Sequence, residues 1–188
     1  RWKKPVVLDE IAYEGNIPHG WGNITAEELV RRFWEAACRG GYAGHGETYL
    51  NPENVLWWSH GGKLHGESQK RFRLLHEILQ ETPGIGLRYD GEHFGEVRAV
   101  PEESWAEQPV KDYYLIYYSF MRPSKDYYFD DTTEFQVKVI DTWNMTVEDR
   151  GVMKGKIHIE LPGRQYMAVQ MKKVRESVAN VSGSGIIN

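Results

Sequence analysis

Acidic residues stand directly after a short apolar run near the start of the chain. The run Pro5–Leu8 precedes Asp9 and Glu10, and Glu14 lies in the following loop, which is rich in Gly, Asn, His and Trp. A strand that delivers carboxylates into an aromatic-lined loop is how an α/β barrel builds a sugar-cleaving site. Such cleavage uses one ionised carboxylate and one protonated carboxyl group. Glu10 is therefore the first catalytic candidate, against the alternative of an ion-paired structural acid. Glu14 is its nearest rival, and Asp9 alternates to the other side of the strand.

A second group of polar residues follows the next expected strand, over residues 42–46. His45, Glu47 and Tyr49 would converge on the same edge as Glu10, because the carboxyl ends of parallel strands lie together. Their side chains suit hydrogen bonding to sugar hydroxyls. A network that only fixes the loop explains them equally well, so both interpretations stay open.

Three tryptophans in polar loops are candidates for sugar binding. An indole face can stack on the apolar face of a pyranose ring, and Trp57 and Trp58 follow the second strand. One of this pair is expected to stack on sugar, with Trp57 preferred, and the other to belong to the core. Trp21, in the first loop, is expected at the rim of the site.

The histidines and the cysteine do not form a metal-binding pattern. His60 and His65 are separated by Gly-Gly-Lys-Leu and followed by Glu67, whereas zinc ligands normally show tighter spacing and include a third ligand. Cys38 is the only cysteine and falls within a helical pattern, which indicates a small buried thiol. The sequence predicts no metal and no cofactor.

Composition narrows the classes of partner. The 188 residues carry a formal net charge of −4, which does not suit the phosphates of nucleic acid. No apolar run approaches the roughly 18 residues of a membrane span, so no membrane partner is expected. Aromatic residues make up 13% of the chain, and aromatic-rich sheets account for about half of them. The others fit a carbohydrate partner.

Helical and strand patterns divide the chain near Pro83. Residues 5–10 predict a buried strand, and Thr25 and Glu28 form a capping box before an amphipathic helix that ends at Gly40. A second helix is predicted over 68–80. This order is typical of two successive β/α units, so residues 1–82 are expected to form an α/β part of either a barrel or a doubly wound sheet.

The remainder of the chain predicts strands. Alternating apolar residues favour an antiparallel β-sandwich over residues 85–172. The tail, 173–188, is expected to be disordered. The individual strands are predicted at 113–120, 133–140, 154–161 and 166–171.

Long aromatic motifs in the chain are similar to those of a bacterial glycoside hydrolase family. The matching segments are PVVLDEIAYEGNIPHGWGN, RRFWEAACRGGYAGHGETYL, WWSHGGKLHGES, VIDTWNMT and IELPGRQYMAV. Members of this family join an apiosidase-like (β/α)8 TIM barrel to a small C-terminal β-sandwich, and many carry a provisional label of β-xylosidase. The resemblance implies that residues 1–82 are the last two β/α units of such a barrel.

The resemblance also implies roles for individual residues. In barrels of this clan the nucleophile ends the seventh strand and the acid/base ends the fourth, so Glu10 corresponds to the nucleophile and the fourth strand lies outside this chain. The chain alone would then be inactive. It would need the N-terminal remainder of the barrel, on the same or a separate polypeptide, or a swapped dimer. The alternatives are a non-catalytic carbohydrate-binding module and a structural accessory module.

Overall fold

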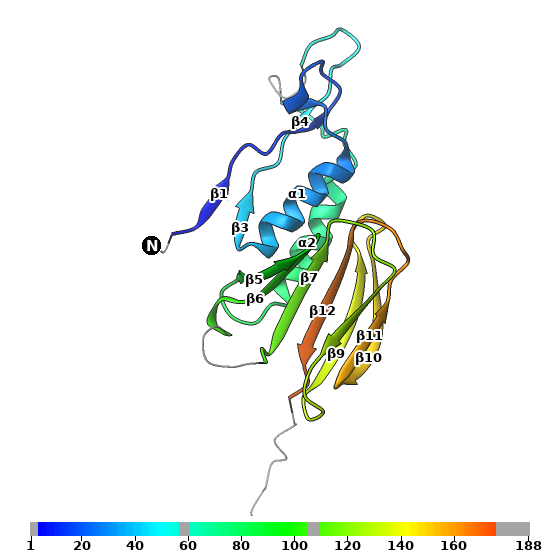
Figure 1. The fold of residues 1–188 in the computed structure, drawn as a ribbon. Helices are drawn as coiled ribbons and strands as arrows, with labels where there is room; N and C mark the ends of the chain where they lie inside the picture. The colour runs from blue at the N-terminus through cyan, green and yellow to red at the C-terminus, as the bar shows by residue number, and fades with distance from the viewer. Residues whose placement is uncertain (1–3, 57–60, 105–109, 176–188) are drawn as a thin grey trace, which may run out of the picture.

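The chain begins with a β-α-β unit. In the computed structural model, which describes residues 4–56, 61–104 and 110–175, strand β1 (Val6–Leu8) lies parallel to β3 (Gly41–Ala43). Helix α1 (Ala26–Cys38) connects them and lies beside β3 (Figure 1). A parallel pair needs such a crossover, because a tight turn cannot return the chain in the same direction.

Helix α1 begins and ends where its sequence predicts. The Thr25 hydroxyl accepts a hydrogen bond from the Glu28 amide at 3.2 Å, which satisfies one of the free amides of the first turn. The Glu28 carboxylate does not complete the capping box, because it pairs with Arg31 and Arg32 instead. Gly40, with φ of +75°, turns the chain into β3.

A second, shorter parallel pair lies beyond the first. Strand β2 (Glu14–Gly15) pairs with β4 (Glu47–Thr48), and the single turn of 3-10 helix η1 (Gly20–Gly22) lies in the loop after β2. Helix α2 (Gln69–Gln80) follows the long segment after β4. The two helices therefore follow the two polar loops that contain the candidate site residues.

The rest of the chain is antiparallel sheet. Six strands form one sheet in the order β10-β9-β12-β7-β6-β5, and two others form a separate pair, β8 and β11. The short 3-10 helix η3 (Glu102–Ser104) follows β6. The strands are β5 (Leu87–His93), β6 (Glu96–Pro101), β7 (Tyr113–Tyr118), β8 (Ser124–Tyr128), β9 (Glu134–Asp141), β10 (Thr146–Lys154), β11 (Lys156–Glu160) and β12 (Met167–Lys173).

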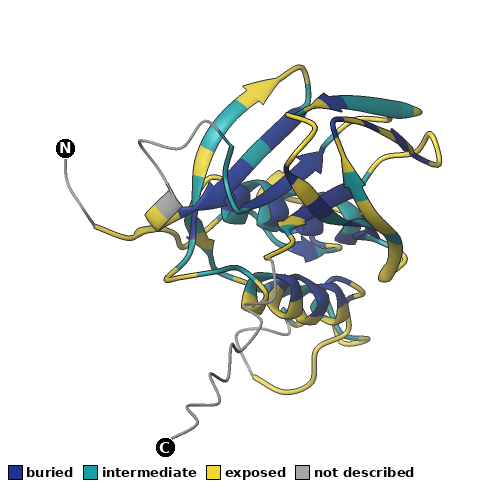
Figure 2. Cartoon of the chain, turned by 90° about the horizontal axis from the view of Figure 1, so that it is seen from below, coloured by how far each residue is buried: buried dark blue, intermediate teal, exposed yellow. Residues whose placement is uncertain are grey.

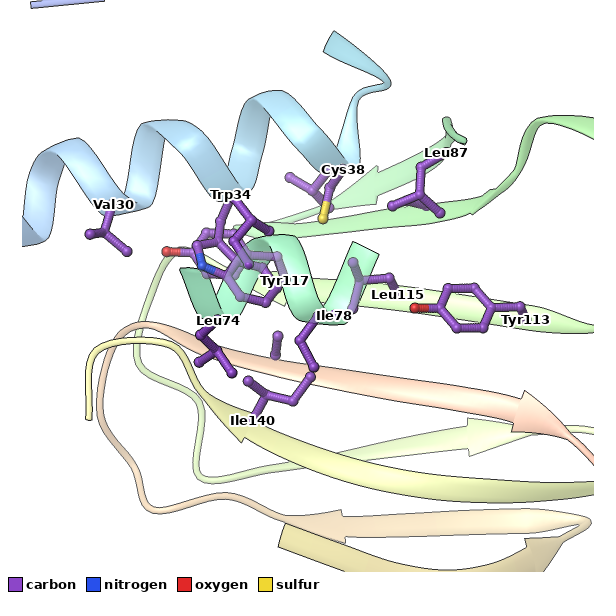
Figure 3. Packing of buried hydrophobic residues seen from close by; sticks show 14 residues of the cluster. Val30, Trp34, Cys38, Leu74, Ile78, Leu87, Tyr113, Leu115, Tyr117 and Ile140 are labelled. Carbon is purple, nitrogen blue, oxygen red and sulfur yellow. The ribbon is translucent and has the colours of Figure 1, made fainter. Parts of the chain in front are cut away.

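The central strands of the six-stranded sheet are covered on both faces. One face packs on α1 and α2, where Trp34 stacks on Tyr117 with ring centroids 5.6 Å apart (Figure 3). The other face packs on β8 and β11 through a second apolar cluster that includes Phe135 and Ile157. Strand β7 is buried along its whole length because it contributes to both clusters. Buried residues accordingly run through the middle of the molecule (Figure 2).

The parallel pair β1 and β3 leaves apolar side chains uncovered. Val6 is 58% exposed, Leu8 41% and Tyr42 61%. A parallel sheet normally has both faces covered, so the exposure of these side chains departs from that rule.

The predicted strands correspond to β1, β3, β7, β9, β11 and β12, and both predicted helices are present. The expectation of a buried strand at residues 5–10 was wrong in its burial, because β1 is exposed along its whole length. The sequence did not predict β2, β4, β5, β6, β8 or β10. Strand β10 is polar and exposed for most of its length, and both β5 and β10 contain a register shift, which interrupts the alternation that identifies a strand. Most of the tail, 176–188, lies outside the described residues.

Candidate functional site

Glu10 lies two residues beyond the carboxyl end of β1, and His45 lies two residues beyond that of β3. Because Leu8 is paired with Ala43, these two side chains leave the sheet at the same edge. The Gly44 amide donates to the Leu8 carbonyl at 2.9 Å and extends the pairing past the strands. Glu10 is exposed, so its carboxylate is open to a ligand.

Tyr13 returns to contact Glu10. Ala12 has φ of +68°, in the left-handed region that most residues avoid, and this reverses the chain after Glu10. Burial, the negative charge of Glu10 and a hydrogen bond between the two side chains raise the pKa of Tyr13. A phenol that stays protonated can donate to the carboxylate and hold its orientation. Sequence reasoning did not identify Tyr13 as a site residue, although its position three residues after Glu10 was visible.

Trp21 is placed at the rim of this region. The loop returns through η1 so that the Tyr13 amide donates to the Trp21 carbonyl at 2.7 Å. The indole is 46% exposed and meets the Tyr13 ring edge to face, with centroids 6.1 Å apart. Its face stacks on His19 at the same distance, with an interplanar angle of 7°. This arrangement links Trp21 to Glu10 through Tyr13.

Glu14 is a buried carboxylate with four hydrogen-bond donors. Its Oε1 accepts from the Tyr49 hydroxyl at 2.8 Å and the Glu67 amide at 2.7 Å. Its Oε2 accepts from the Ser68 amide at 3.1 Å and the Ser68 hydroxyl at 2.6 Å. Burial acts to raise the pKa of Glu14, but these bonds outweigh it and lower the pKa below its usual value. Glu14 is therefore an ionised acid engaged by the protein itself.

Glu47 lies next to Glu14 across the parallel pair β2 and β4 and is equally buried. Its Oε2 accepts from the amides of His65, at 2.7 Å, and Gly66, at 2.9 Å. Its Oε1 is buried and has no hydrogen-bond partner among the residues that the structure describes, although the His45 Nε2 lies 3.8 Å away. Glu47 therefore combines a structural oxygen with one whose hydrogen-bonding capacity is unused.

Together the two carboxylates bind four consecutive backbone amides, from residue 65 to residue 68. We call this arrangement the double clamp. It lies directly before α2, where a negative charge is also favoured by the helix dipole. Gly66 is required here, because a Cβ at that position would lie 2.4 Å from Glu14 Oε2. The double clamp fixes the segment that leads into α2.

His45 connects the double clamp to the exposed edge. Its ring lies edge-on to Phe33 and Phe72, with centroid distances of 6.5 and 5.1 Å, and its Nε2 is 3.5 Å from the Ser68 hydroxyl. Burial lowers the pKa of His45, although Glu47 and Glu14 act in the opposite direction. The side chain remains 22% exposed. A neutral imidazole here can donate or accept one hydrogen bond.

The structure thus brings the predicted residues together in two groups. Glu14, His45, Glu47 and Tyr49 share the double clamp and its surroundings, and Glu10 and Trp21 share contacts with Tyr13. Trp57, Trp58 and His60 lie outside the described residues. Within the described ranges, no three His, Cys, Asp or Glu side chains are grouped to hold a metal ion. In the same ranges, no helix has the length and apolar character needed to cross a membrane.

Comparison with known proteins gives matches in fold. A family model described as a domain of unknown function, DUF5605, matches residues 102–172, which is less than half of the chain. No curated protein sequence matches significantly.

Several solved structures share the fold. A Bacteroides vulgatus protein provisionally described as a glycoside hydrolase superposes with a TM-score of 0.74 at 24% identity, over 91% of this chain and 36% of its own. A glycoside hydrolase gives 0.63 at 13% identity, over 93% of this chain and 43% of its own. A family 5 glycoside hydrolase from Bacteroides vulgatus gives 0.63 at 12% identity, over 90% and 41%. The chain therefore has the fold of a part of these glycoside hydrolases and spans 36–43% of their length.

Proposed function

We propose that this chain is the C-terminal portion of a glycoside hydrolase that cleaves O-glycosidic bonds in oligosaccharides or polysaccharides. In this proposal residues 1–82 are the last two β/α units of a (β/α)8 barrel, and residues 85–172 are its β-sandwich. The observation that carries the proposal is the pair β1 and β3, which leaves apolar side chains uncovered and Glu10 open at its carboxyl end. The likeness in fold to parts of three glycoside hydrolases supports it.

The uncovered pair also supports a partner for this part of the chain. In a closed barrel every strand has two neighbours, whereas among the described strands β1 and β3 pair only with each other. We propose that the remainder of the barrel covers Val6, Leu8 and Tyr42, either from the same or a separate polypeptide or in a swapped dimer. Sedimentation of this chain as a well-behaved monomer, with slowly exchanging amides in β1, would contradict that proposal.

Glu10 is the proposed nucleophile. Its carboxylate is exposed at the edge shared with His45, and Tyr13 can hold it with a hydrogen bond. An ionised carboxylate in such a position can attack an anomeric carbon, while the acid that protonates the leaving oxygen would come from the absent part of the barrel. Glu14 suits this role less well, because four donors already occupy its two oxygens.

The proposed sugar pocket lies around Glu10. The exposed face of Trp21 and the neutral ring of His45 are the groups best placed to contact a substrate. Glu47 and Tyr49 act mainly by holding the double clamp in position, since Glu47 accepts from the Gly66 amide and Tyr49 donates to Glu14. Trp57 and Trp58 stay in the proposal as stacking residues on the basis of sequence alone.

The test is the Glu10→Gln substitution in the intact enzyme. It removes the negative charge while keeping the shape, and loss of an essential catalytic group costs about three to five decades in rate, or roughly 4–7 kcal/mol of barrier. Turnover of a panel of aryl glycosides is measured together with thermal unfolding. We expect loss of turnover in Glu10→Gln with unchanged stability.

Glu14→Gln is the matched control, because it makes the same chemical change at the nearest rival. If Glu10→Gln keeps full turnover and Glu14→Gln loses it without losing stability, the nucleophile is Glu14. If both variants cleave every substrate that the wild type cleaves, this chain does not supply the nucleophile. It is then a carbohydrate-binding or structural accessory part.

A further inference from the structure

A cleft lies on the face of the six-stranded sheet that points away from the helices. It is bordered by β6 and β7 on one side and by β8 on the other, with a volume of about 400 Å³. We call it the flank cleft. Strand β8 contributes Lys125, Asp126, Tyr127 and Tyr128 to its lining, and Phe129 follows directly after the strand. Because alternate side chains point to opposite faces of a strand, this means that the edge of β8, including its backbone, borders the cleft.

The charges in the flank cleft are balanced. Glu96 has a side chain only 7% exposed, and its Oε2 lies 2.7 Å from Lys125 Nζ. Arg98, on the same strand, pairs with Asp90 through an Nε–Oδ2 contact of 2.9 Å. Asp126 adds a negative charge at the rim, where it pairs with Lys156 at 3.0 Å. A buried carboxylate is costly to maintain without a partner, so the Glu96 pair is a built feature of the fold.

Aromatic side chains supply the apolar part of the lining. Tyr114 and Tyr127 are almost fully buried, and the Tyr127 hydroxyl is hydrogen-bonded to that of Tyr118. The ring of Tyr128 is 73% exposed at the rim. The cleft therefore combines aromatic rings with charged donors and acceptors in one small volume. Pockets that bind small ligands range from about 300 to 1,000 Å³ and share this mixture of apolar walls and a few polar groups.

We propose that the flank cleft binds an uncharged sugar. An anionic ligand would meet the carboxylates of Glu96 and Asp126, and a cationic one would meet Lys125 and Arg98. A neutral polyol can instead donate to the acids and accept from the bases, while its C–H groups lie on the exposed ring of Tyr128. The site lies across the sheet from α1 and α2 and does not use Glu10. It is therefore independent of the proposed hydrolytic site.

The test is a titration followed by ¹⁵N–¹H correlation spectra of the whole chain. The probes are xylose, galactose, arabinose and xylotriose, with glucuronate and glucosamine as charged counterparts. We expect at least one neutral sugar to bind with a dissociation constant below about 10 mM, a range typical of weak complexes of roughly −3 to −4 kcal/mol. Shifts should concentrate at residues 93–98, 114–116 and 125–129.

Two substitutions test the charge argument, one that removes a negative charge and one that removes a positive charge. Glu96→Gln and Arg98→Gln should each weaken binding of the neutral sugar about tenfold or more, and only Glu96→Gln should improve relative binding of glucuronate. Glu148→Gln is the control, because it removes an acid of the same sheet outside the cleft. Circular dichroism checks that each variant is folded. If Glu96→Gln unfolds, Arg98→Gln still tests the proposal, because Arg98 is partly exposed and its replacement should be tolerated.

Three outcomes would overturn the proposal. The first is that none of the neutral sugars shifts any resonance of the cleft. The second is that shifts appear only near Glu10, His45 and Trp21, which would support the hydrolytic site and reject the flank cleft. The third is preferential binding of glucuronate or glucosamine by the unaltered chain, which would show that the cleft favours a charged ligand over a neutral one.

Discussion

The double clamp predicts that replacing Glu14 lowers the stability of the fold, which distinguishes a structural carboxylate from a catalytic one. Replacing Glu14 by Gln keeps the size of the side chain but exchanges one oxygen for an NH₂ group. Each oxygen of Glu14 accepts from one hydroxyl and one backbone amide. In either orientation of the new amide, its NH₂ faces one such pair. The hydroxyl of that pair can rotate to accept, but the backbone amide cannot.

The cost follows from those bonds. A buried donor left without an acceptor costs about 1–3 kcal/mol, and hydrogen bonds to a charged group contribute about 1.5–3 kcal/mol against 0.5–1.5 for neutral ones. Some of the loss is offset because the neighbouring Glu47 no longer faces a second negative charge. We therefore expect Glu14→Gln to lower the free energy of unfolding by about 2–4 kcal/mol.

Urea unfolding measures that change, and hydrogen exchange locates it. The amides of Glu67 and Ser68 should exchange faster in the variant, since they lose the ionised acceptor. Glu77→Gln is the control, because Glu77 makes only an exposed ion pair with Arg73 on α2. Pairs of this kind contribute about 0–1 kcal/mol. The control should therefore unfold nearly as the wild type does.

The dependence on pH provides a second measurement. The pKa of Glu14 is lower in the folded chain than its usual value of 4.5, so its contribution to stability is fully present above pH 4.5. That contribution is lost as the pH falls through the lowered pKa. Glu14→Gln should lack this part of the acid dependence. Unchanged stability and an unchanged acid profile in the variant would refute the double clamp as a stabilising feature.

Three further predictions concern single residues. Gly66→Ala should lower the free energy of unfolding by about 1–3 kcal/mol, because its Cβ would meet the Glu14 carboxylate. Gly20→Ala is the control and should leave stability unchanged, because no atom lies within 4 Å of a Cβ at that position. Equal stability of the two variants in urea would contradict the close approach. Burial raises the pKa of Cys38 to about 12, so a chromogenic thiol reagent should react with it only in the unfolded chain, and rapid reaction at neutral pH in the native chain would disagree. Thr25→Ala should cost about 1 kcal/mol in thermal unfolding, with Thr25→Ser retaining most of that stability, since the hydroxyl is the group that caps α1.

The helices could be predicted well because their signals are local. A cap at Thr25, a repeating apolar face and a terminal glycine each act within a few residues, and the structure places α1 where they indicate. The strands that could not be predicted lack a regular apolar alternation, because β10 is mostly polar and both β5 and β10 contain a register shift. Strand β5 lies at the edge of the sheet beside β6, and its polar residues are acceptable because that edge is partly open to water.

The organisation of the core could not be read from the sequence either. The change of pattern near Pro83 suggests two separate parts, yet Trp34 of α1 and Tyr117 of β7 stack in one apolar cluster. The boundary at residues 82–85 stays a prediction, while the helices and the sheet share one apolar cluster. Contacts of this kind join residues that are far apart along the chain, and a single sequence gives no signal for them.

The candidate site shows the same limit in chemical terms. Sequence places Glu10, Glu14 and Glu47 after strands, and all three could serve as sugar-facing acids. What separates them is the number of donors that the fold directs at each one. Glu14 and Glu47 receive the amides of residues 65–68, whereas Glu10 is left exposed with Tyr13 beside it. A carboxylate that anchors a helix and one that attacks a sugar can therefore look alike in sequence, and the exposed position of Glu10 is the reason to test it first.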